Sequence, residues 1–256
     1  MQKILDDKTS GSEELLIKLN GYLYHCISPI ENPLQFIKEL KNLFPTFQAI
    51  RSYLNELEKN SGNKKELISF IQKKSQKKFE SINSIYKSAE KYLKTCSKLL
   101  TISNSWTVTE IIKKLYSDKN NLTIFISESR PMFEGRITAA NLSVHKIKTE
   151  LITEARTAVY VQKCDAAIIG ADKILEDGSV INKAGSLNIA IACKHYSKPF
   201  YVVAREVKRI SENSFEEIEQ GFDEIWHGKL SEVVIKNFYF ERIPSELISR
   251  IFTDSK

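Results

Sequence analysis

The chain has 256 residues, of which 42% are hydrophobic and 27% charged, and its formal net charge is +6. This composition is too apolar for a disordered protein and too polar for a membrane bundle. The length allows one large α/β domain, or a helical domain joined to an α/β domain.

Residues 1–97 are predicted to form a helical domain. Apolar residues recur every three or four positions, most clearly from Ile82 to Leu93, with lysine and glutamate between them. Pairs or triplets of helix-breaking residues divide this half into about four helices. They are Ser-Pro at 28–29, Asn-Pro at 32–33, Phe-Pro at 44–45 and Ser-Gly-Asn at 61–63.

The positive charge is concentrated in this half, which has 16 Lys and Arg against 11 Asp and Glu. Its densest part is the group Lys73, Lys74, Lys77 and Lys78. Such a group can contact a phosphate backbone or an acidic protein, or it can be a solvated helix face. No aromatic or glycine-rich motif accompanies the lysines, so we expect no direct nucleic-acid binding.

Residues 98–256 are predicted to form an α/β domain. Short apolar runs at 98–103, 122–127, 149–153, 166–170 and 199–204 alternate with helical patterns at 107–116, 136–146, 155–163 and 184–196. This alternation is typical of a mainly parallel sheet covered by helices on both faces. Side chains that follow the strands of such a sheet gather at its carboxyl edge, where ligands bind.

Small polar residues follow the first predicted strand. Ser103, Asn104 and Ser105 would present backbone N–H groups, hydroxyls and an amide to that edge, which suits an anion or a sugar hydroxyl. Simple helix capping is the alternative. Thr107 and Glu110 have the spacing of a capping box and are expected to open the next helix.

The other candidate ligand-binding residues follow the second and fourth predicted strands or precede a helix; they are Glu128, Arg130, Asp172, Asn182 and Lys183. Arg130, fixed by the proline after it, suits phosphate or carboxylate recognition, although a surface pair with Glu128 would look the same. Asp172 follows a buried run and a glycine, where it would serve acid–base chemistry or cap a helix. Asn182 and Lys183 precede a helix and suit an oxyanion, with a surface-loop lysine as the alternative.

The sequence lacks the motifs that several classes of protein require for nucleotide binding, metal binding or disulfide formation. The sequence has no GxGxxG, Walker or HExxH motif, and its four cysteines and four histidines show no metal or disulfide spacing. The longest apolar run, 189–193, is far shorter than the roughly 20 residues that cross a bilayer, and the first residues carry no export signal. We therefore expect a cytoplasmic protein with no metal, cofactor or membrane contact.

Taken in order, these segments resemble the alpha, beta and delta subunits of translation initiation factor 2B and the related sugar-phosphate isomerases. Those isomerases act on ribose-1,5-bisphosphate or methylthioribose-1-phosphate. The matching stretches cover almost all of the second half, and Pro45-Thr46 matches the family's Pro-Thr helix in the first. The stretches are 100–105, 128–142 (ESRPMFEGRITAANL), 165–174 (DAAIIGADKI), 180–186 (VINKAGS), 199–204 and 244–254.

The resemblance implies a helical domain (1–97) followed by a Rossmann-like domain (98–256) that carries the ligand crevice and pairs with a copy of itself or a related subunit. It also implies a catalytic pair in the isomerases, a cysteine after the first strand and the aspartate that matches Asp172. In this chain Ser103 stands at the cysteine position. A serine hydroxyl is a much weaker acid than a thiol and needs a neighbouring base, which Ile102 does not supply.

Two functions are therefore weighed. The first is a non-catalytic regulatory subunit of the initiation factor 2B type, with initiation factor 2 as a candidate partner and a sugar phosphate or nucleotide as a candidate ligand. The second is an aldose–ketose isomerase that works from Asp172, with Ser103 as the second catalytic residue. The aromatic stretch 237–240 favours a dimer interface in the second domain, while completion of the monomer's own sheet is the alternative.

Overall fold

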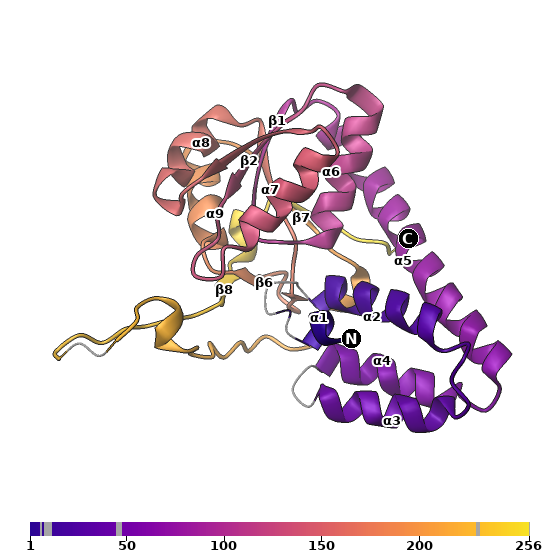
Figure 1. The fold of residues 1–256 in the computed structure, drawn as a ribbon. Coiled ribbons are helices and arrows are strands. Elements are labelled where there is room, and N and C mark those ends of the chain that lie inside the picture. Colours follow the sequence, from indigo (N-terminus) through magenta and orange to yellow (C-terminus); the bar gives the residue numbers. More distant parts are fainter. Residues whose placement is uncertain (6, 8–11, 45–47, 229–230, 256) are drawn as a thin grey trace. The chain divides into compact units, whose positions relative to one another are not determined.

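The computed structural model describes residues 1–5, 7, 12–44, 48–228 and 231–255 (Figure 1). The chain forms two compact units, Met1–Ser81 and Ile82–Lys256, and each is described by itself. The units divide within a long helix, whereas the sequence places the domain boundary at residue 97, just before the first strand. The predicted Pro45-Thr46 match lies outside the described residues.

The first unit is helical. It contains α1 (Gln2–Leu5), α2 (Ser12–Cys26), α3 (Pro33–Leu43), α4 (Gln48–Lys59) and the first part of α5 (Lys64–Leu93). The Asn-Pro pair begins α3, because the Asn32 side chain accepts a hydrogen bond from the Gln35 N–H and proline occupies the first helical position. Leucine and isoleucine side chains from these helices form a separate core.

Two of the four clustered lysines on α5 are engaged within this unit. Lys74 pairs with Glu56 and lies 5.2 Å from the ring of Phe70. The Lys78 ammonium donates to the Glu13 carbonyl over 3.2 Å. Two of the clustered lysines therefore contact other groups of the first unit, and the cluster is not a wholly solvated helix face.

The second unit contains a six-stranded parallel sheet, and the predicted α/β fold is confirmed. Its order is β3-β2-β1-β4-β7-β9, with each adjacent pair parallel. The order reverses direction between β1 and β4, as in doubly wound nucleotide-binding folds. The strands are β1 (Lys98–Ile102), β2 (Thr123–Ser127), β3 (Lys148–Ile152), β4 (Ala166–Ile169), β7 (Phe200–Val203) and β9 (Arg250–Phe252).

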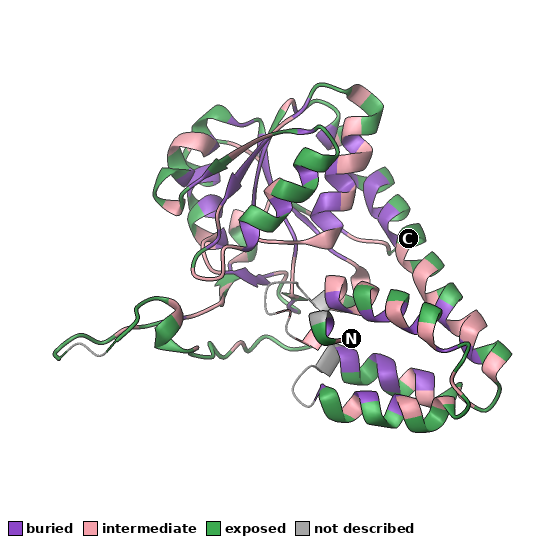
Figure 2. Ribbon diagram, viewed as in Figure 1, coloured by how far each residue is buried: buried purple, intermediate pink, exposed green. Residues whose placement is uncertain are grey.

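Helices cover both faces of this sheet, because alternate strand residues point to opposite sides. Leu99 and Ile168 pack with the end of α5 and with α6 (Trp106–Lys119), while α7 (Glu134–Val144) adds Leu142 to the same core. Leu100 and Ile169 pack on the other side with α8 (Thr157–Lys163) and α9 (Ser186–His195). Figure 2 shows the strands as the buried centre of this unit.

A second, antiparallel sheet was not predicted. It has the order β5-β6-β8, formed by β5 (Lys173–Ile174), β6 (Val180–Lys183) and β8 (Phe240–Ile243). Each strand has at most four residues and carries polar side chains, so neither length nor alternation marked it in the sequence. The aromatic stretch 237–240 runs into β8, so it partly completes the monomer's own sheet, yet Phe240 remains 40% exposed.

The predicted start of the helix after β1 is wrong. Thr107 and Glu110 do not form the opening capping box. Ser105 caps α6 instead, since its hydroxyl accepts a hydrogen bond from the Val108 N–H over 3.4 Å. The helix therefore begins at Trp106, closer to the end of the strand than the sequence pattern suggested.

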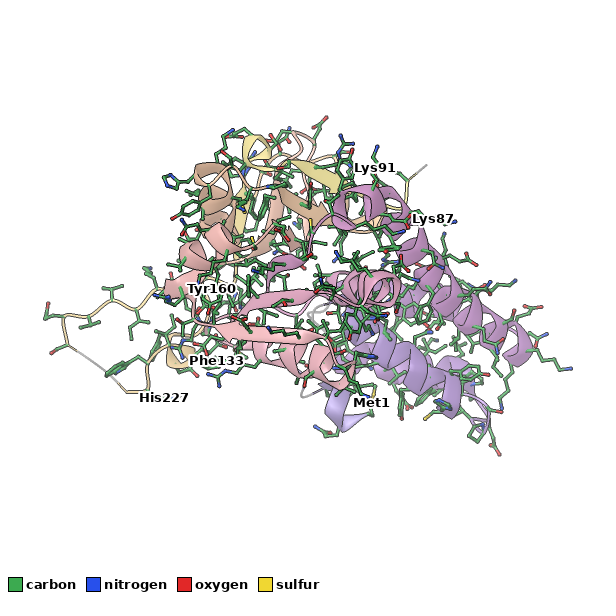
Figure 3. The ribbon with its side chains drawn as sticks, turned by 90° about the horizontal axis from the view of Figure 1, so that it is seen from above. Met1, Lys87, Lys91, Phe133, Tyr160 and His227 are labelled. Atoms are coloured by element: carbon green, nitrogen blue, oxygen red, sulfur yellow. The ribbon has the colours of Figure 1, made fainter. Side chains whose placement is uncertain are left out.

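Residues 211–228 and 231–239 belong to an arm with little regular structure that extends away from the sheet (Figures 1 and 3). His227 lies on its outer part (Figure 3). At its base the two limbs meet, because Glu219 and Phe238 form an antiparallel bridge and the Gln220 N–H donates to the Asn237 carbonyl over 2.8 Å. Several large apolar side chains on the arm are exposed: Ile218, Phe222, Ile225, Trp226, Val233 and Val234.

No helix in the described part of the chain is both long enough and apolar enough to span a bilayer.

Candidate functional site

The carboxyl ends of β1 and β4 lie side by side where the strand order of the parallel sheet reverses. A Cβ atom on Gly170, which follows β4, would come within 2.5 Å of the Ser105 hydroxyl oxygen. A side chain at position 170 would therefore collide with the loop after β1. This edge is the position at which open parallel sheets bind ligands.

Ser103 lies at the centre of the edge in a left-handed backbone conformation, with a φ of 65°. Its N–H donates to the Ser129 hydroxyl oxygen over 2.8 Å, and its carbonyl accepts from the Thr138 hydroxyl over 3.0 Å. The same Thr138 hydroxyl lies 3.1 Å from the side-chain oxygen of Asn104. The backbone of the loop is thus fixed from two sides, while Ser103 itself stays partly exposed.

The loop after β2 is held by Glu154. One carboxylate oxygen of Glu154 accepts from the N–H groups of Ser129, over 2.6 Å, and Arg130, over 3.3 Å. The exposed Arg130 guanidinium lies 5.0 Å from the Phe133 ring. Glu128 pairs instead with Arg136 over 2.7 Å, so the surface Arg–Glu pair considered from the sequence forms with a different arginine.

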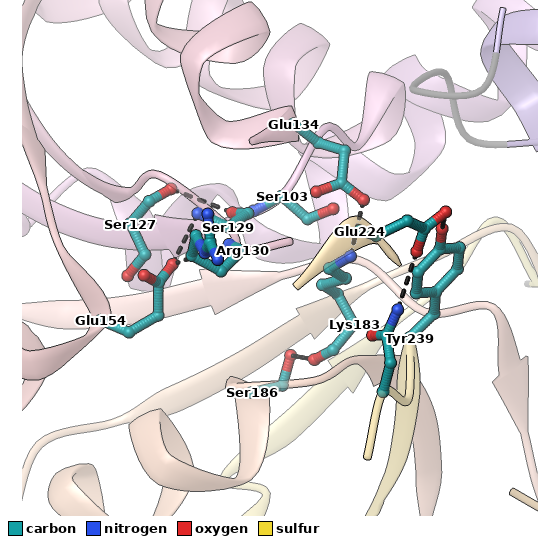
Figure 4. A network of polar contacts seen from close by, with 11 residues as sticks. Ser103, Ser127, Ser129, Arg130, Glu134, Glu154, Lys183, Ser186, Glu224 and Tyr239 are labelled. Carbon is teal, nitrogen blue, oxygen red and sulfur yellow. Dashed lines mark hydrogen bonds and ion pairs between the residues drawn. The ribbon is translucent and has the colours of Figure 1, made fainter. Parts of the chain in front are cut away.

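Lys183 is buried in an ion pair with Glu134, a residue that the sequence analysis missed (Figure 4). The Lys183 ammonium donates to Oε1 of Glu134 over 2.8 Å, and it lies 4.7 Å from the centre of the Tyr239 ring. The Tyr239 hydroxyl in turn donates to Glu224 at the base of the arm. Burial raises the pKa of the Tyr239 hydroxyl, and the hydrogen bond to Glu224 raises it further.

Asn182 and Asp172, the remaining predicted residues, contact Ser186 and Lys208 respectively. The Asn182 amide donates to the Ser186 hydroxyl over 2.9 Å and is buried inside the turn before α9. The Asp172 carboxylate lies 4.0 Å from the Lys208 ammonium and is 38% exposed. The structure thus links Ser103, through Ser129 and the loop after β2, to the start of α7 and to Lys183 (Figure 4). That these groups bind a ligand stays a prediction.

Glu241 on β8 caps the helix that follows Lys183. Its Oε1 accepts hydrogen bonds of 2.7 Å from the N–H groups of Gly185 and Leu187, which start α9. Burial raises the pKa of Glu241 above its ordinary value of 4.5, and the two backbone hydrogen bonds oppose that rise. A carboxylate at a helix N-terminus satisfies donors that have no partner within the helix.

Replacing Glu241 by glutamine should change how stability depends on pH. A raised folded pKa means that the folded state holds this proton more tightly than the unfolded state does. The free energy of unfolding of the original protein should therefore fall as pH rises from 4.5 through the folded pKa. Glutamine keeps the acceptor but does not titrate, so the stability of Glu241→Gln relative to the original should increase across that interval. Urea denaturation between pH 4.5 and 8 measures this, and a decreasing difference would contradict the argument.

None of the three cysteines of the second unit lies at the carboxyl edge of the sheet. Cys96 and Cys164 directly precede β1 and β4, at the opposite edge, and Cys193 lies in the last turn of α9. Burial raises the pKa of Cys164 and Cys193 to about 12, so neither thiol ionises readily. Cys26 belongs to the first unit. Among the described residues, no group of three or more His, Cys, Asp or Glu side chains is placed to hold a metal ion.

Comparison with known proteins identifies the family. The model of the initiation factor 2 subunit family matches residues 1–255. The chain belongs to this family. The predicted resemblance is confirmed, and the match includes the helical first unit, where the sequence motifs were sparse.

Relatives within the family carry two kinds of name. An eIF-2B subunit 2-like protein of Pyrococcus horikoshii is 39% identical over 110 residues, which are 43% of this chain and 40% of that protein. A ribose 1,5-bisphosphate isomerase of Methanocaldococcus jannaschii is 27% identical over 173 residues, covering 63% and 54%. The chain thus spans about half the length of the curated relatives it matches.

A solved structure shares the fold over nearly the whole chain. The translation initiation factor eIF-2B subunit delta from A. fulgidus superposes with a TM-score of 0.81 at 21% identity, covering 99% of this chain and 84% of that one. At this identity the likeness concerns the fold alone. Subunits named for translation and enzymes named for sugar-phosphate isomerisation therefore both occur among the relatives of this chain.

Proposed function

We propose that this chain is a non-catalytic regulatory subunit of the initiation factor 2B type. One observation carries the proposal: within the described residues, no side chain accepts a hydrogen bond from the Ser103 hydroxyl. A serine hydroxyl becomes reactive only through an adjacent base. Its backbone is held in place, but the group that would exchange a proton with a substrate is not activated.

Purified protein should show no turnover of ribose-1,5-bisphosphate or methylthioribose-1-phosphate above background. The reason is the unactivated hydroxyl at position 103, together with the location of the second unit's three thiols away from this edge. A coupled or NMR assay of ketose formation measures the reaction. Turnover in the usual enzyme range of about 1–10³ s⁻¹, abolished by Asp172→Asn, would overturn the proposal.

A sugar-phosphate isomerase working from Asp172 is the second candidate. The partly exposed Asp172 carboxylate and the cationic Arg130 favour it, since an isomerase needs a proton acceptor and a phosphate partner. A relative named as ribose 1,5-bisphosphate isomerase also supports it. The assay with the Asp172→Asn variant decides between the two candidates.

The arm supports a role performed through protein contacts. Between residues 212 and 224 the sequence has six acidic residues and no lysine or arginine. Exposed apolar side chains accompany them, including Ile218 at 72% and Trp226 at 51% exposure. An exposed apolar group of this kind marks a protein interface. We propose that a second copy or a related subunit covers it, with initiation factor 2 as the larger partner.

Light scattering should therefore find a homodimer, near twice the monomer mass of 29.4 kDa, or a heteromer with a related subunit. Glutamate at both Phe222 and Trp226 should convert the homodimer to monomer, since the new charges would be buried in the contact. The matched change, glutamate at the exposed Val207 outside the arm, should leave the dimer intact. A monomer at high micromolar concentration, with no partner captured from native cytosol, would contradict the proposal.

A further inference from the structure

A cavity of about 490 Å³ opens at the amino edge of the parallel sheet, opposite the edge that carries Ser103. Its wall combines the starts of β7 and β9 with the ends of α5 and α9, and every lining residue belongs to the second unit. Pockets that hold small molecules typically have volumes of about 300–1,000 Å³. The cavity is therefore large enough for a small ligand.

Three of the described residues that line this cavity carry a positive charge. They are Lys194, Lys198 and Arg250, and no Asp or Glu shares the wall with them. Their side-chain nitrogens form no hydrogen bond or ion pair with the described part of the chain. A concave surface lined by charges of one sign concentrates its potential. The cavity should therefore attract an anion.

The two lysines are not needed to cap α9. A helix C-terminus attracts cations because its last carbonyls lack partners within the helix. Here the carbonyls of Ala192, Cys193 and Lys194 accept hydrogen bonds of 3.0, 2.8 and 3.3 Å. The donors are the backbone N–H groups of residues 196, 198 and 197, respectively. Because the backbone satisfies this helix end, the ammonium groups remain available to a ligand.

The Tyr201 hydroxyl is a second, independent indication of a ligand. Tyr201 lines the cavity and is only 8% exposed, yet its hydroxyl has no hydrogen-bond partner among the described residues. Burial raises the pKa of Tyr201 above its ordinary value of 10.0, so the hydroxyl keeps its proton at neutral pH. Buried polar groups are hydrogen-bonded in the great majority of cases. An oxygen atom of a ligand in the cavity would supply the missing acceptor.

Aromatic rings form the apolar part of the wall. The ring centres of Tyr92 and Tyr201 lie 6.0 Å apart, and Phe252 packs against both. The Arg250 guanidinium lies 4.9 Å from the centre of the Tyr92 ring, and the ammonium of Lys91, near the end of α5, lies 5.0 Å from it (Figure 3). Tyrosine rings and a stacked guanidinium both pack well against a planar group. The wall thus suits a ligand that joins an anionic group to a ring.

We propose that this cavity binds a small ligand in which a phosphate group is attached to a ring. The phosphate contacts Lys198, Arg250 and the Tyr201 hydroxyl, and the ring contacts the tyrosine side chains. A phosphate monoester carries a charge of about −1.5 to −2 at pH 7, so it balances several cations better than a single carboxylate does. Arginine and lysine are both suited to binding phosphate. The site is separate from the edge that carries Ser103, so the inference goes beyond the proposed function.

Phenyl phosphate is the probe that tests this inference, titrated into the full chain by calorimetry. Inorganic phosphate lacks the ring and should bind about fivefold more weakly, and the uncharged benzyl alcohol should not bind measurably. Lys198→Gln and Arg250→Gln should each weaken phenyl phosphate binding about tenfold, because each removes a charged contact. Tyr201→Phe keeps the ring and removes only the hydroxyl, so it should weaken binding about fivefold.

Lys163→Gln is the matched control. The exposed Lys163 ammonium lies 5.0 Å from the centre of the Tyr160 ring on α8, and neither residue lines the cavity. The change removes one positive charge from a similar lysine–tyrosine contact and should leave the affinity for phenyl phosphate within about twofold.

Three results would overturn the inference. They are no binding of phenyl phosphate to the original protein, an affinity that Lys198→Gln and Tyr201→Phe leave within about twofold, and a loss in Lys163→Gln as large as the loss in Lys198→Gln. Inorganic phosphate that binds as tightly as phenyl phosphate would overturn the assignment of the ring. Lys198→Gln and Tyr201→Phe keep the test decisive even if Arg250→Gln does not fold.

Discussion

Replacing Lys183 by methionine should lower the free energy of unfolding by about 3–5 kcal/mol, the usual cost of leaving a buried charge without its partner. The side chains have similar length, so the main change is electrostatic. Glu134 would lose the donor to Oε1 while Oε2 already has none among the described residues. Urea denaturation at pH 7 measures the loss.

The matched change, Lys113→Met, removes an ammonium from the partly exposed pair with Glu110 and should cost less, about 1 kcal/mol. Adding Glu134→Gln to Lys183→Met should restore most of the lost stability, because the pair is then replaced by two neutral groups. Equal losses in Lys183→Met and Lys113→Met would show that the buried pair does not stabilise the fold.

Replacing Gly135 by alanine should destabilise the second unit by about 3 kcal/mol or more. The new Cβ would lie 1.8 Å from the Ser127 carbonyl oxygen and 2.9 Å from its carbon, both backbone atoms that cannot rotate away. The first turn of α7 would have to move off the end of β2. Glu134, directly before Gly135, would move with it, so the Lys183 pair should weaken as well.

Gly21→Ala is the control for this change. Gly21 lies within α2, and among the described residues no atom outside the helix lies within 4 Å of a Cβ placed there. Alanine should raise stability by up to about 1 kcal/mol, because it restricts the unfolded chain and favours helix. A loss in Gly135→Ala below about 1 kcal/mol, measured by thermal and urea unfolding, would show that α7 can shift without cost.

Five of the six parallel strands could be predicted, chiefly because the central ones are buried on both faces, whereas the short edge strand β9 was not predicted. The runs around Leu100, Phe125 and Ile168 are nearly continuous in apolar residues and alternate with helical patterns, which few other folds produce. The ends of those runs then located Ser103 and Asp172 at one edge of the sheet. The apolar pattern indicates which residues of a strand are buried and where the strand ends, so it was sufficient to locate the central strands.

The partners of the site residues could not be predicted in the same way. Glu134 stands in the first turn of α7, where an acidic residue is expected for the helix dipole alone, so nothing in its position indicated a buried lysine 49 residues away. Asn182 and Lys183 are adjacent in sequence, yet one bonds within the turn and the other crosses to α7. Such contacts depend on how separate elements pack, which local patterns do not contain.

The cysteines of the two units differ in exposure, so their reactivity can be used to follow unfolding of the second unit. Cys26 is partly exposed in the first unit, whereas Cys96, Cys164 and Cys193 are buried in the second. A small alkylating reagent should modify Cys26 quickly in the folded state, since reaction requires access to the thiol. The other three should react only when the sheet and its helices separate. Timed alkylation followed by mass spectrometry would therefore follow the unfolding of the second unit without any introduced label.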